Sequence, residues 1–176
     1  GDDVVLSNMK RGYTRDQYVE KIREIKEEIP DVTLTTDLIV GFPGESRPQF
    51  DNSVEILNLI KFDKVHASAY SERSGTIASR KLPDTVEQKE KKLRLREIND
   101  IQQRIQAEKN KKLLGDTLDI LIEGERRGRI FGRAKNDKIV YINDDDGKNC
   151  SNGQIVKVKI NQTSSWSMEG VPLGTG

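Results

Sequence analysis

The chain of 176 residues contains one cysteine, Cys150. A single cysteine excludes a disulfide within the chain, and it excludes any metal or iron–sulfur site held by cysteines alone. Because Cys150 lies in the polar segment KNCSNG, we interpret it as an incidental thiol and not as a ligand.

Long apolar runs are also lacking. None approaches the ~20 residues that a helix needs to cross a bilayer, and the first residues, GDDVVLSNMK, have no signal-peptide pattern. We therefore expect a cytoplasmic protein with no membrane partner. The chain starts at Gly1 without a methionine, so we also expect it to be part of a longer protein.

A strong net charge is lacking as well, because 30 Lys and Arg stand against 29 Asp and Glu. Only local clusters can then bind phosphates. Residues 84–113 are one such segment, with 9 basic against 6 acidic side chains. The apolar fraction of 34% is low for one well-filled core, and the length allows one or two domains.

Two helices and two strands are predicted in residues 1–83. Thr14 with Gln17, and Ser46 with Gln49, match the capping box that begins a helix, and apolar residues follow at helical spacing. Two β-branched runs, VTLTTDLIV and DKVHASAY, predict strands, the first of them buried. The alternation of helix and strand predicts an α/β unit with parallel strands and helices packed outside.

The rest of the chain predicts a long helix and then an all-β unit. Residues 84–113 lack an internal Gly or Pro, and Asp84 can cap this helix. Its apolar residues are sparse, so we expect a solvated linker. From Gly115 onward, apolar and polar residues alternate between short turns, which predicts a small closed barrel of the kind that binds oligonucleotides. The predicted domains are 1–83, 84–113 (the linker) and 114–173.

The segment TDLIVGFPGE, residues 36–45, is the strongest candidate for a ligand site. A strand ends there in glycines, and ligands of parallel α/β folds bind at the carboxyl ends of strands. Asp37 lies in an otherwise apolar strand, and a buried carboxylate is costly unless it has a partner. The alternative is a plain strand-to-helix turn in which Asp37 bonds to the backbone or to a neighbouring helix.

Four blocks of the sequence resemble one known family, the MiaB-like radical-SAM tRNA methylthiotransferases. The blocks, in order, are MKRGYT (9–14), TTDLIVGFPGE (35–45), FDKVHASAYSERSGTIA (62–78) and TSSWSMEG (163–170). The resemblance implies the C-terminal portion of an enzyme that adds a methylthio group to C2 of an N6-modified adenosine next to the anticodon. Its partner would be the tRNA anticodon stem-loop.

The resemblance also implies a fold and cofactors. Residues 1–83 would be the last part of a partial TIM-type (β/α) barrel, and residues 114–173 a TRAM domain, an OB-like RNA-binding β-barrel. The parent enzyme would use S-adenosylmethionine (SAM) and two [4Fe–4S] clusters. This chain lacks the CxxxCxxC motif, so we expect no cluster in it and no activity from it alone. Two alternatives stay open: a non-catalytic RNA-binding module, and the sister enzyme that modifies a ribosomal protein.

Three residues match positions where enzymes of this family contact SAM, and three more would line the site. Arg11 would bind the SAM carboxylate and Asp37 the ribose hydroxyls, and Tyr70 would lie near the adenine. The residues that would shape the adenine wall are Gly41, Phe42 and Gly44. Arg11 as a surface arginine and Tyr70 as a core tyrosine are the alternatives. We nominate no general acid, base or nucleophile, and we assign no chemistry to His66.

The predicted RNA-binding segment is RRGRIFGRAKNDK, because cations can neutralise phosphates and an aromatic ring can stack on a base. The residues are Arg126, Arg127, Arg129, Phe131, Arg133, Lys135 and Lys138. The alternative is a solvated hairpin whose phenylalanine fills the core. Trp166 could stack on a base or close the barrel, and we expect it to close the barrel. Two lone parallel strands also leave edges unpaired, so we expect residues 1–83 to pair with another copy or to be poorly ordered.

Overall fold

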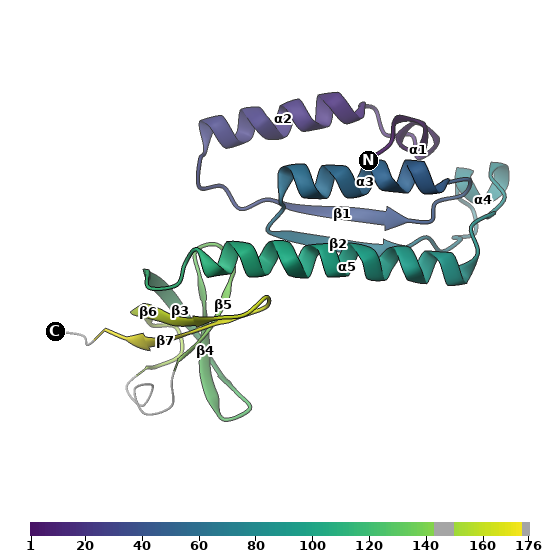
Figure 1. Ribbon diagram of the computed structural model, residues 1–176. Coiled ribbons are helices and arrows are strands. Elements are labelled where there is room, and N and C mark those ends of the chain that lie inside the picture. The colour runs from purple at the N-terminus through teal and green to yellow at the C-terminus, as the bar shows by residue number, and fades with distance from the viewer. Residues whose placement is uncertain (143–149, 174–176) are drawn as a thin grey trace. The chain divides into compact units, whose positions relative to one another are not determined.

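The computed structural model describes residues 1–142 and 150–173, and the chain divides into two compact units (Figure 1). The N-terminal unit is Gly1–Gln102, and the barrel unit is Gln103–Gly176. The predicted domain 114–173 and the predicted KNCSNG segment each include residues of the range 143–149, which lie outside the described residues.

The N-terminal unit is built on two parallel strands, β1 (Thr35–Val40) and β2 (Lys64–Ala69). Its helices are α1 (Asp3–Asn8), α2 (Arg15–Glu28), α3 (Arg47–Ile60), α4 (Ile77–Lys81) and the first part of α5 (Gln88–Lys111). Side chains of α2, α3 and α5 pack together with those of both strands in one apolar core, which includes Val40, Phe50, Phe62 and Ile98. The predicted order of parallel strands and outer helices is confirmed.

Helix starts in this unit follow the predicted capping boxes. The Thr14 hydroxyl accepts a hydrogen bond from the backbone N–H of Gln17, and the Gln17 side-chain oxygen accepts one from the Thr14 N–H. Ser46 and Gln49 form the second capping box, at the start of α3. Where local hydrogen bonds decide a helix start, the sequence therefore predicts it well.

The Asp2 carboxylate joins two helices of the unit. It caps α1 through the backbone of Val4 and Val5, and it accepts hydrogen bonds from Gln49 and Asn52 of α3. Partial burial alone would raise the pKa of Asp2, but the hydrogen bonds, with that of Val5 first, outweigh it and lower the pKa below its usual value. Asp2 therefore holds α1 against α3 in its charged form.

The prediction that the first strand is buried, with Asp37 inside, is wrong. Thr35, Asp37 and Ile39 alternate on an exposed face, and only Val40 is fully buried. A strand shows alternate side chains on opposite faces, and the helices cover only one face of this sheet. The other face is open, and Lys64, His66 and Ser68 of β2 are exposed on it too.

Two smaller predictions for residues 71–111 are also wrong. The expected loop contains the short helix α4, which Thr76 caps. Helix α5 begins at Gln88 and not at Asp84, whose carboxylate instead bonds to Lys91. The long helix itself is present as predicted, but its N-terminal half is not a solvated linker, because Lys91 and Arg94 are buried within the N-terminal unit.

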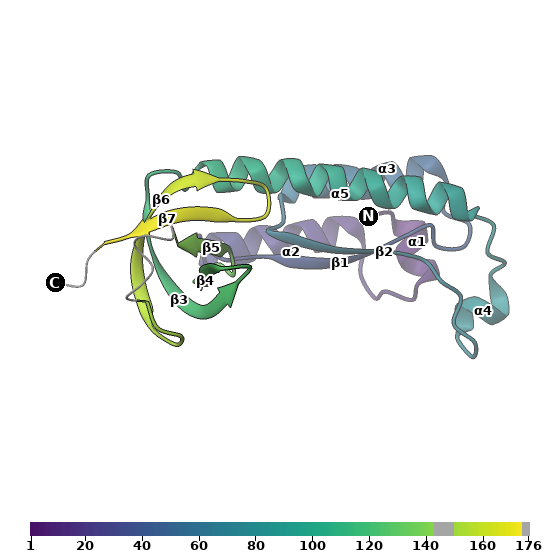
Figure 2. The same ribbon diagram turned by 90° about the horizontal axis from the view of Figure 1, so that it is seen from below.

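Five strands close the barrel of the second unit in the order β3-β4-β5-β7-β6 (Figure 2). They are β3 (Thr117–Arg126), β4 (Arg129–Ala134), β5 (Ile139–Ile142), β6 (Ile155–Thr163) and β7 (Met168–Pro172). Among these five described strands, β5 and β7 pair in parallel and the other neighbours pair antiparallel. The small closed barrel is confirmed, although the sequence did not indicate β7 as a strand. Among the residues that the structure describes, nine buried side chains fill its core, including Ile120, Val140, Ile160 and Met168.

Candidate functional site

The GFPGE turn follows directly from the end of β1. Gly41 and Gly44 have φ of +69° and +80°, a left-handed conformation that glycine adopts without strain. The Gly41 N–H donates to the Glu45 carboxylate at 2.6 Å, and the Glu45 N–H donates to the Phe42 carbonyl at 2.9 Å. The turn is thus closed on itself by Glu45, which is only 4% exposed.

An aromatic pair joins this turn to the end of β2. The rings of Phe42 and Tyr70 meet edge to face, with centroids 5.3 Å apart and planes at 75°. The Tyr70 N–H donates to the carbonyl of Val40 at 2.8 Å. Four of the predicted nucleoside-binding residues therefore gather at the carboxyl ends of the two strands: Gly41, Phe42, Gly44 and Tyr70.

The other two predicted residues, Arg11 and Asp37, line a separate cavity of about 160 Å³ together with Tyr13 and Arg15. The four strand-end residues do not line it. Its volume is below the ~300–1,000 Å³ typical of small-molecule pockets. Because Asp37 is exposed, its charge does not need a ligand to compensate for burial. The exposed carboxylate is nevertheless accessible to a ligand.

Sequence reasoning missed three charged residues at the GFPGE turn, which are Glu45, Lys91 and Arg94. Arg94 donates to the Glu45 carboxylate at 2.9 Å, and both side chains are almost fully buried. The sequence contained one signal for the buried face of α5. Lys91 and Arg94 lie at helical spacing with the apolar Ile98, on the same face of the helix.

The predicted RNA-binding segment forms a hairpin of β3 and β4. Its two-residue turn, Arg127–Gly128, has positive φ at both positions, as a type I′ turn requires. Arg126, Arg127 and Lys135 are exposed. The hairpin therefore displays Arg126 and Arg127 at its tip, while Lys135 follows the other end of β4.

Phe131 does not belong to the barrel core. It lies opposite Tyr141 on the neighbouring strand, with ring centroids 6.2 Å apart. The guanidinium of Arg129 lies 4.9 Å from the centre of the Tyr141 ring and pairs with Glu169 at 3.0 Å. The alternative in which Phe131 fills the core is thus excluded, and Tyr141 is an aromatic residue of this face that sequence reasoning missed.

Several cations of the segment are already paired. Arg133 bonds to Glu123 at 2.9 Å and to Asp137 at 2.8 Å. Lys138 donates to Gln106 of α5 at 3.0 Å. The cluster therefore carries less uncompensated positive charge than its composition suggests, and the hairpin tip carries most of what is exposed.

The prediction that Trp166 closes the barrel is wrong, because its side chain is 63% exposed. Trp166 lies in the β6–β7 turn, where the Ser164 hydroxyl accepts from the N–H groups of Trp166 and Ser167. Asn110 of α5 also donates to the Ser164 carbonyl at 2.7 Å. Met168, two residues on, is fully buried and takes the core position.

Cys150 and His66 offer no metal site. Cys150 packs against the barrel core, and burial raises the pKa of its thiol. Among residues 1–142 and 150–173, no group of three His, Cys, Asp or Glu side chains could hold a metal ion. In the same part of the chain, no helix is long and apolar enough to cross a membrane.

Residues 111–173 match the family model of the TRAM domain. The match covers all five strands of the barrel, so the barrel unit is defined as a TRAM domain, as the resemblance implied.

The chain as a whole is similar to a set of curated tRNA-modifying enzymes. It is 43% identical over 174 residues, 97% of the chain, to the tRNA-2-methylthio-N(6)-dimethylallyladenosine synthase of Roseiflexus sp.. Enzymes of the same name from Dehalococcoides mccartyi and Herpetosiphon aurantiacus are 41% and 40% identical over 96% and 99% of the chain. The resemblance to methylthiotransferases is confirmed. The chain spans 36–40% of the length of these relatives.

Proposed function

We propose that this chain is part of a tRNA methylthiotransferase that adds a methylthio group to C2 of an N6-modified adenosine next to the anticodon. The observation that carries the proposal is the similarity to such enzymes across both units, and not across the TRAM domain alone. A tRNA substrate also implies a cytoplasmic enzyme.

We assign a separate part of the enzyme to each of the two units. In this proposal the N-terminal unit, Gly1–Gln102, is the last part of a partial (β/α) barrel of the radical-SAM type, the rest of α5 connects it to the strands, and residues 114–173 are the RNA-binding barrel. Parallel strands with helices on one face and an open second face support the first assignment. In a closed barrel the open face, with Asp37 on it, would point inward.

The described residues fit one part of a SAM site. Gly44 is exposed and Tyr70 is half-buried at the strand ends, whereas Gly41 and Phe42 are buried and would shape the site from beneath. Asp37 would accept ribose hydroxyls, and Arg11 would bind the SAM carboxylate through its guanidinium. SAM supplies the radical and methyl-transfer chemistry. The described residues do not fit an iron–sulfur cluster, so no step is assigned to one here.

The RNA grip is assigned to the β3–β4 hairpin. Arg126, Arg127 and Lys135 would contact phosphates, while Phe131 and Tyr141, backed by Arg129, offer aromatic surface to a base. The remaining predicted cations, Arg133 and Lys138, would act mainly by holding the hairpin and α5 in place.

The activity is tested with the full-length protein and tRNA that carries the N6-modified adenosine but no methylthio group, by mass spectrometry of the digested nucleosides. We expect the methylthio mass on the N6-modified adenosine. A tRNA that stays unmodified while a ribosomal protein gains the methylthio group would overturn the proposal in favour of the sister enzyme.

The RNA grip is tested by the salt dependence of tRNA binding. The double substitution Arg126→Glu with Arg127→Glu removes two phosphate contacts, so the slope of log affinity against log salt should fall by ~0.7–0.9 per contact. The control Lys157→Glu changes a charge elsewhere, on β6, where Lys157 pairs with Asp119 at 3.2 Å. Equal slopes for the double variant and the wild type would remove the hairpin from the RNA site.

A further inference from the structure

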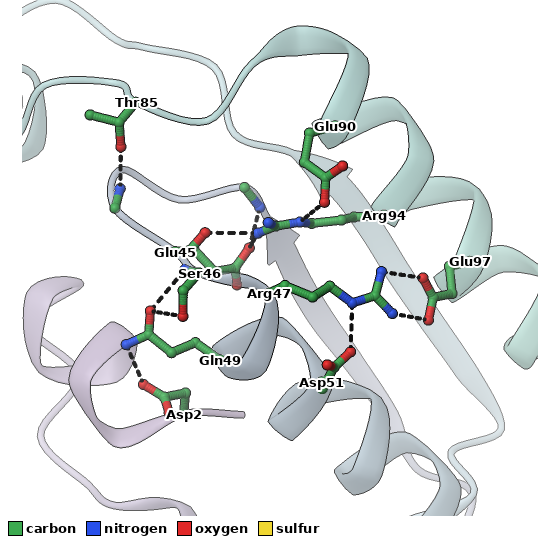
Figure 3. Close-up of polar contacts among 12 residues, drawn as sticks. Asp2, Glu45, Ser46, Arg47, Gln49, Asp51, Thr85, Glu90, Arg94 and Glu97 are labelled. Carbon is green, nitrogen blue, oxygen red and sulfur yellow. Dashed lines mark hydrogen bonds and ion pairs between the residues drawn. The ribbon is translucent and has the colours of Figure 1, made fainter.

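Helix α5 delivers two cations to the ends of β1 and β2. Arg94 is 4% exposed and Lys91 is 0% exposed, which is unusual for charged side chains. Figure 3 shows Arg94 reaching from α5 to Glu45 of the GFPGE turn, while Glu90, on the preceding turn of the helix, accepts a hydrogen bond from it. The turn and the helix are far apart in sequence but are joined directly.

Arg94 holds the turn at two acceptors. Its Nη1 atom donates to the carboxylate of Glu45 and to the Glu45 carbonyl, each at 2.9 Å, and its Nε atom donates to Glu90 at 2.8 Å. The same Glu45 carboxylate oxygen accepts from Gly41. One carboxylate therefore connects the first glycine of the turn to a guanidinium on α5.

Lys91 fixes the neighbouring strand end. Its Nζ atom donates to the carbonyl of Tyr70 at 3.3 Å and to the carboxylate of Asp84 at 2.5 Å. Its aliphatic part packs so closely on Gly41 that a Cβ there would lie 2.4 Å from the Lys91 Cγ. Only glycine fits at position 41, both for its positive φ and for this contact.

These contacts constrain a turn whose own backbone is flexible. Its two left-handed glycines leave the backbone many alternative conformations when nothing constrains it. Buried ion pairs add little net stability compared with apolar packing, but removing one partner is costly. The effect of a buried arginine that binds a backbone carbonyl and a carboxylate at once is to select one geometry of the turn.

We propose that Arg94 and Glu45, together with Lys91, are positioning residues that hold the turn Gly41–Gly44 in the shape that receives the nucleoside of SAM. The proposal rests on the proposed function, since it takes SAM as the ligand of this turn. Holding the turn before the ligand arrives lowers the ordering cost of binding. Ligand affinity is thereby set by a helix that lies outside the predicted binding residues.

The test compares Arg94→Lys with the control Arg47→Gln. Arg47 also joins α3 to α5, through an exposed pair with Glu97 at 2.8 Å, but it makes no contact with the turn (Figure 3). We expect amide hydrogen exchange of residues 41–45 to accelerate on the order of tenfold in Arg94→Lys and to stay near wild type in Arg47→Gln. In the full-length protein, the Kd for SAM should rise on the order of tenfold in Arg94→Lys only.

A second variant, Thr85→Val, tests the turn with less risk of misfolding than a substitution of the buried Arg94. The Thr85 hydroxyl accepts from the Gly44 N–H at 3.2 Å, so Thr85→Val loosens the same turn without stranding a buried charge. We expect exchange at Gly44 to accelerate a few-fold with an unchanged melting temperature.

Two outcomes would overturn the proposal. Equal exchange rates in Arg94→Lys and Arg47→Gln would mean that the helix does not hold the turn. Faster exchange with an unchanged Kd for SAM would mean that the turn is held for another reason. Neither outcome touches the proposed function, which fails only if the wild-type enzyme leaves tRNA unmodified.

Discussion

At the scale of single residues, Asp37 is exposed at the open face of the sheet, while Arg94 is buried against Glu45 at the end of β1. The glycines and aromatic residues of the strand ends gather as predicted, because strand direction and turn chemistry are local properties. The exposure of Asp37 could not be predicted from its apolar neighbours. Burial along β1 alternates because helices cover only one face of the sheet, and the sequence of the strand does not say which face is covered. The burial of Arg94 depends on Glu45, 49 residues earlier, and no local pattern carries that information.

Trp166 gives a prediction at this scale. Because its side chain is 63% exposed, Trp166→Ala should change the stability of the barrel by no more than about 0.5 kcal/mol. Chemical denaturation followed by circular dichroism measures the change. Met168→Ala, at a fully buried position two residues on, serves as the contrast and should cost about 2–5 kcal/mol. A loss of that size in Trp166→Ala would restore its closing role.

Because the chain has one tryptophan, its fluorescence reports the exposure of Trp166 alone. We expect its fluorescence to resemble that of tryptophan in water and to be quenched efficiently by acrylamide. A blue-shifted emission that is shielded from acrylamide would contradict the exposed position.

At the scale of elements, capped helices and alternating strands were predicted and β7 was not. Met168–Pro172 is a strand because both its neighbours, β5 and β6, offer it hydrogen bonds, and not because its residues favour one. The presence of the long helix α5 was predicted, but its start was not, and neither was the burial of Lys91 and Arg94, which depends on contacts with other elements.

The pairing of β3 with β4 requires a glycine at position 132, because there is no room for a side chain there. A Cβ at Gly132 would lie 2.2 Å from the carbonyl oxygen of Leu121 and 2.8 Å from Ile120. Backbone cannot yield as a side chain can, so Gly132→Ala should destabilise the barrel by about 1–3 kcal/mol. Thermal unfolding of the barrel measures the loss. Gly12→Ala, where a Cβ meets nothing within 4 Å, is the matched control and should be nearly neutral.

At the scale of the whole molecule, the sheet of the N-terminal unit is the exposed element of greatest consequence. Within the described residues, β1 and β2 pair only with each other, and one face of their sheet is open. Open edges and apolar positions favour association between copies. The sequence predicted these edges, because two strands cannot close a barrel.

We therefore expect the chain to self-associate as its concentration rises, as measured by light scattering. Ile39→Lys adds a charge to the open face, where Ile39 is 37% exposed, and should reduce association without unfolding the unit. Leu59→Lys makes the same change on α3, at 64% exposure, and should have little effect. Equal behaviour of the two variants would rule out the sheet as the contact.

The strand order of the barrel has a consequence for its synthesis. Because β7 is inserted between β5 and β6, neither of those strands has its second neighbour until Met168–Pro172 has been made. A nascent chain on the ribosome must hold its unfinished barrel open through almost all of translation of this unit. Chaperones that bind extended apolar strands would have that whole interval in which to act.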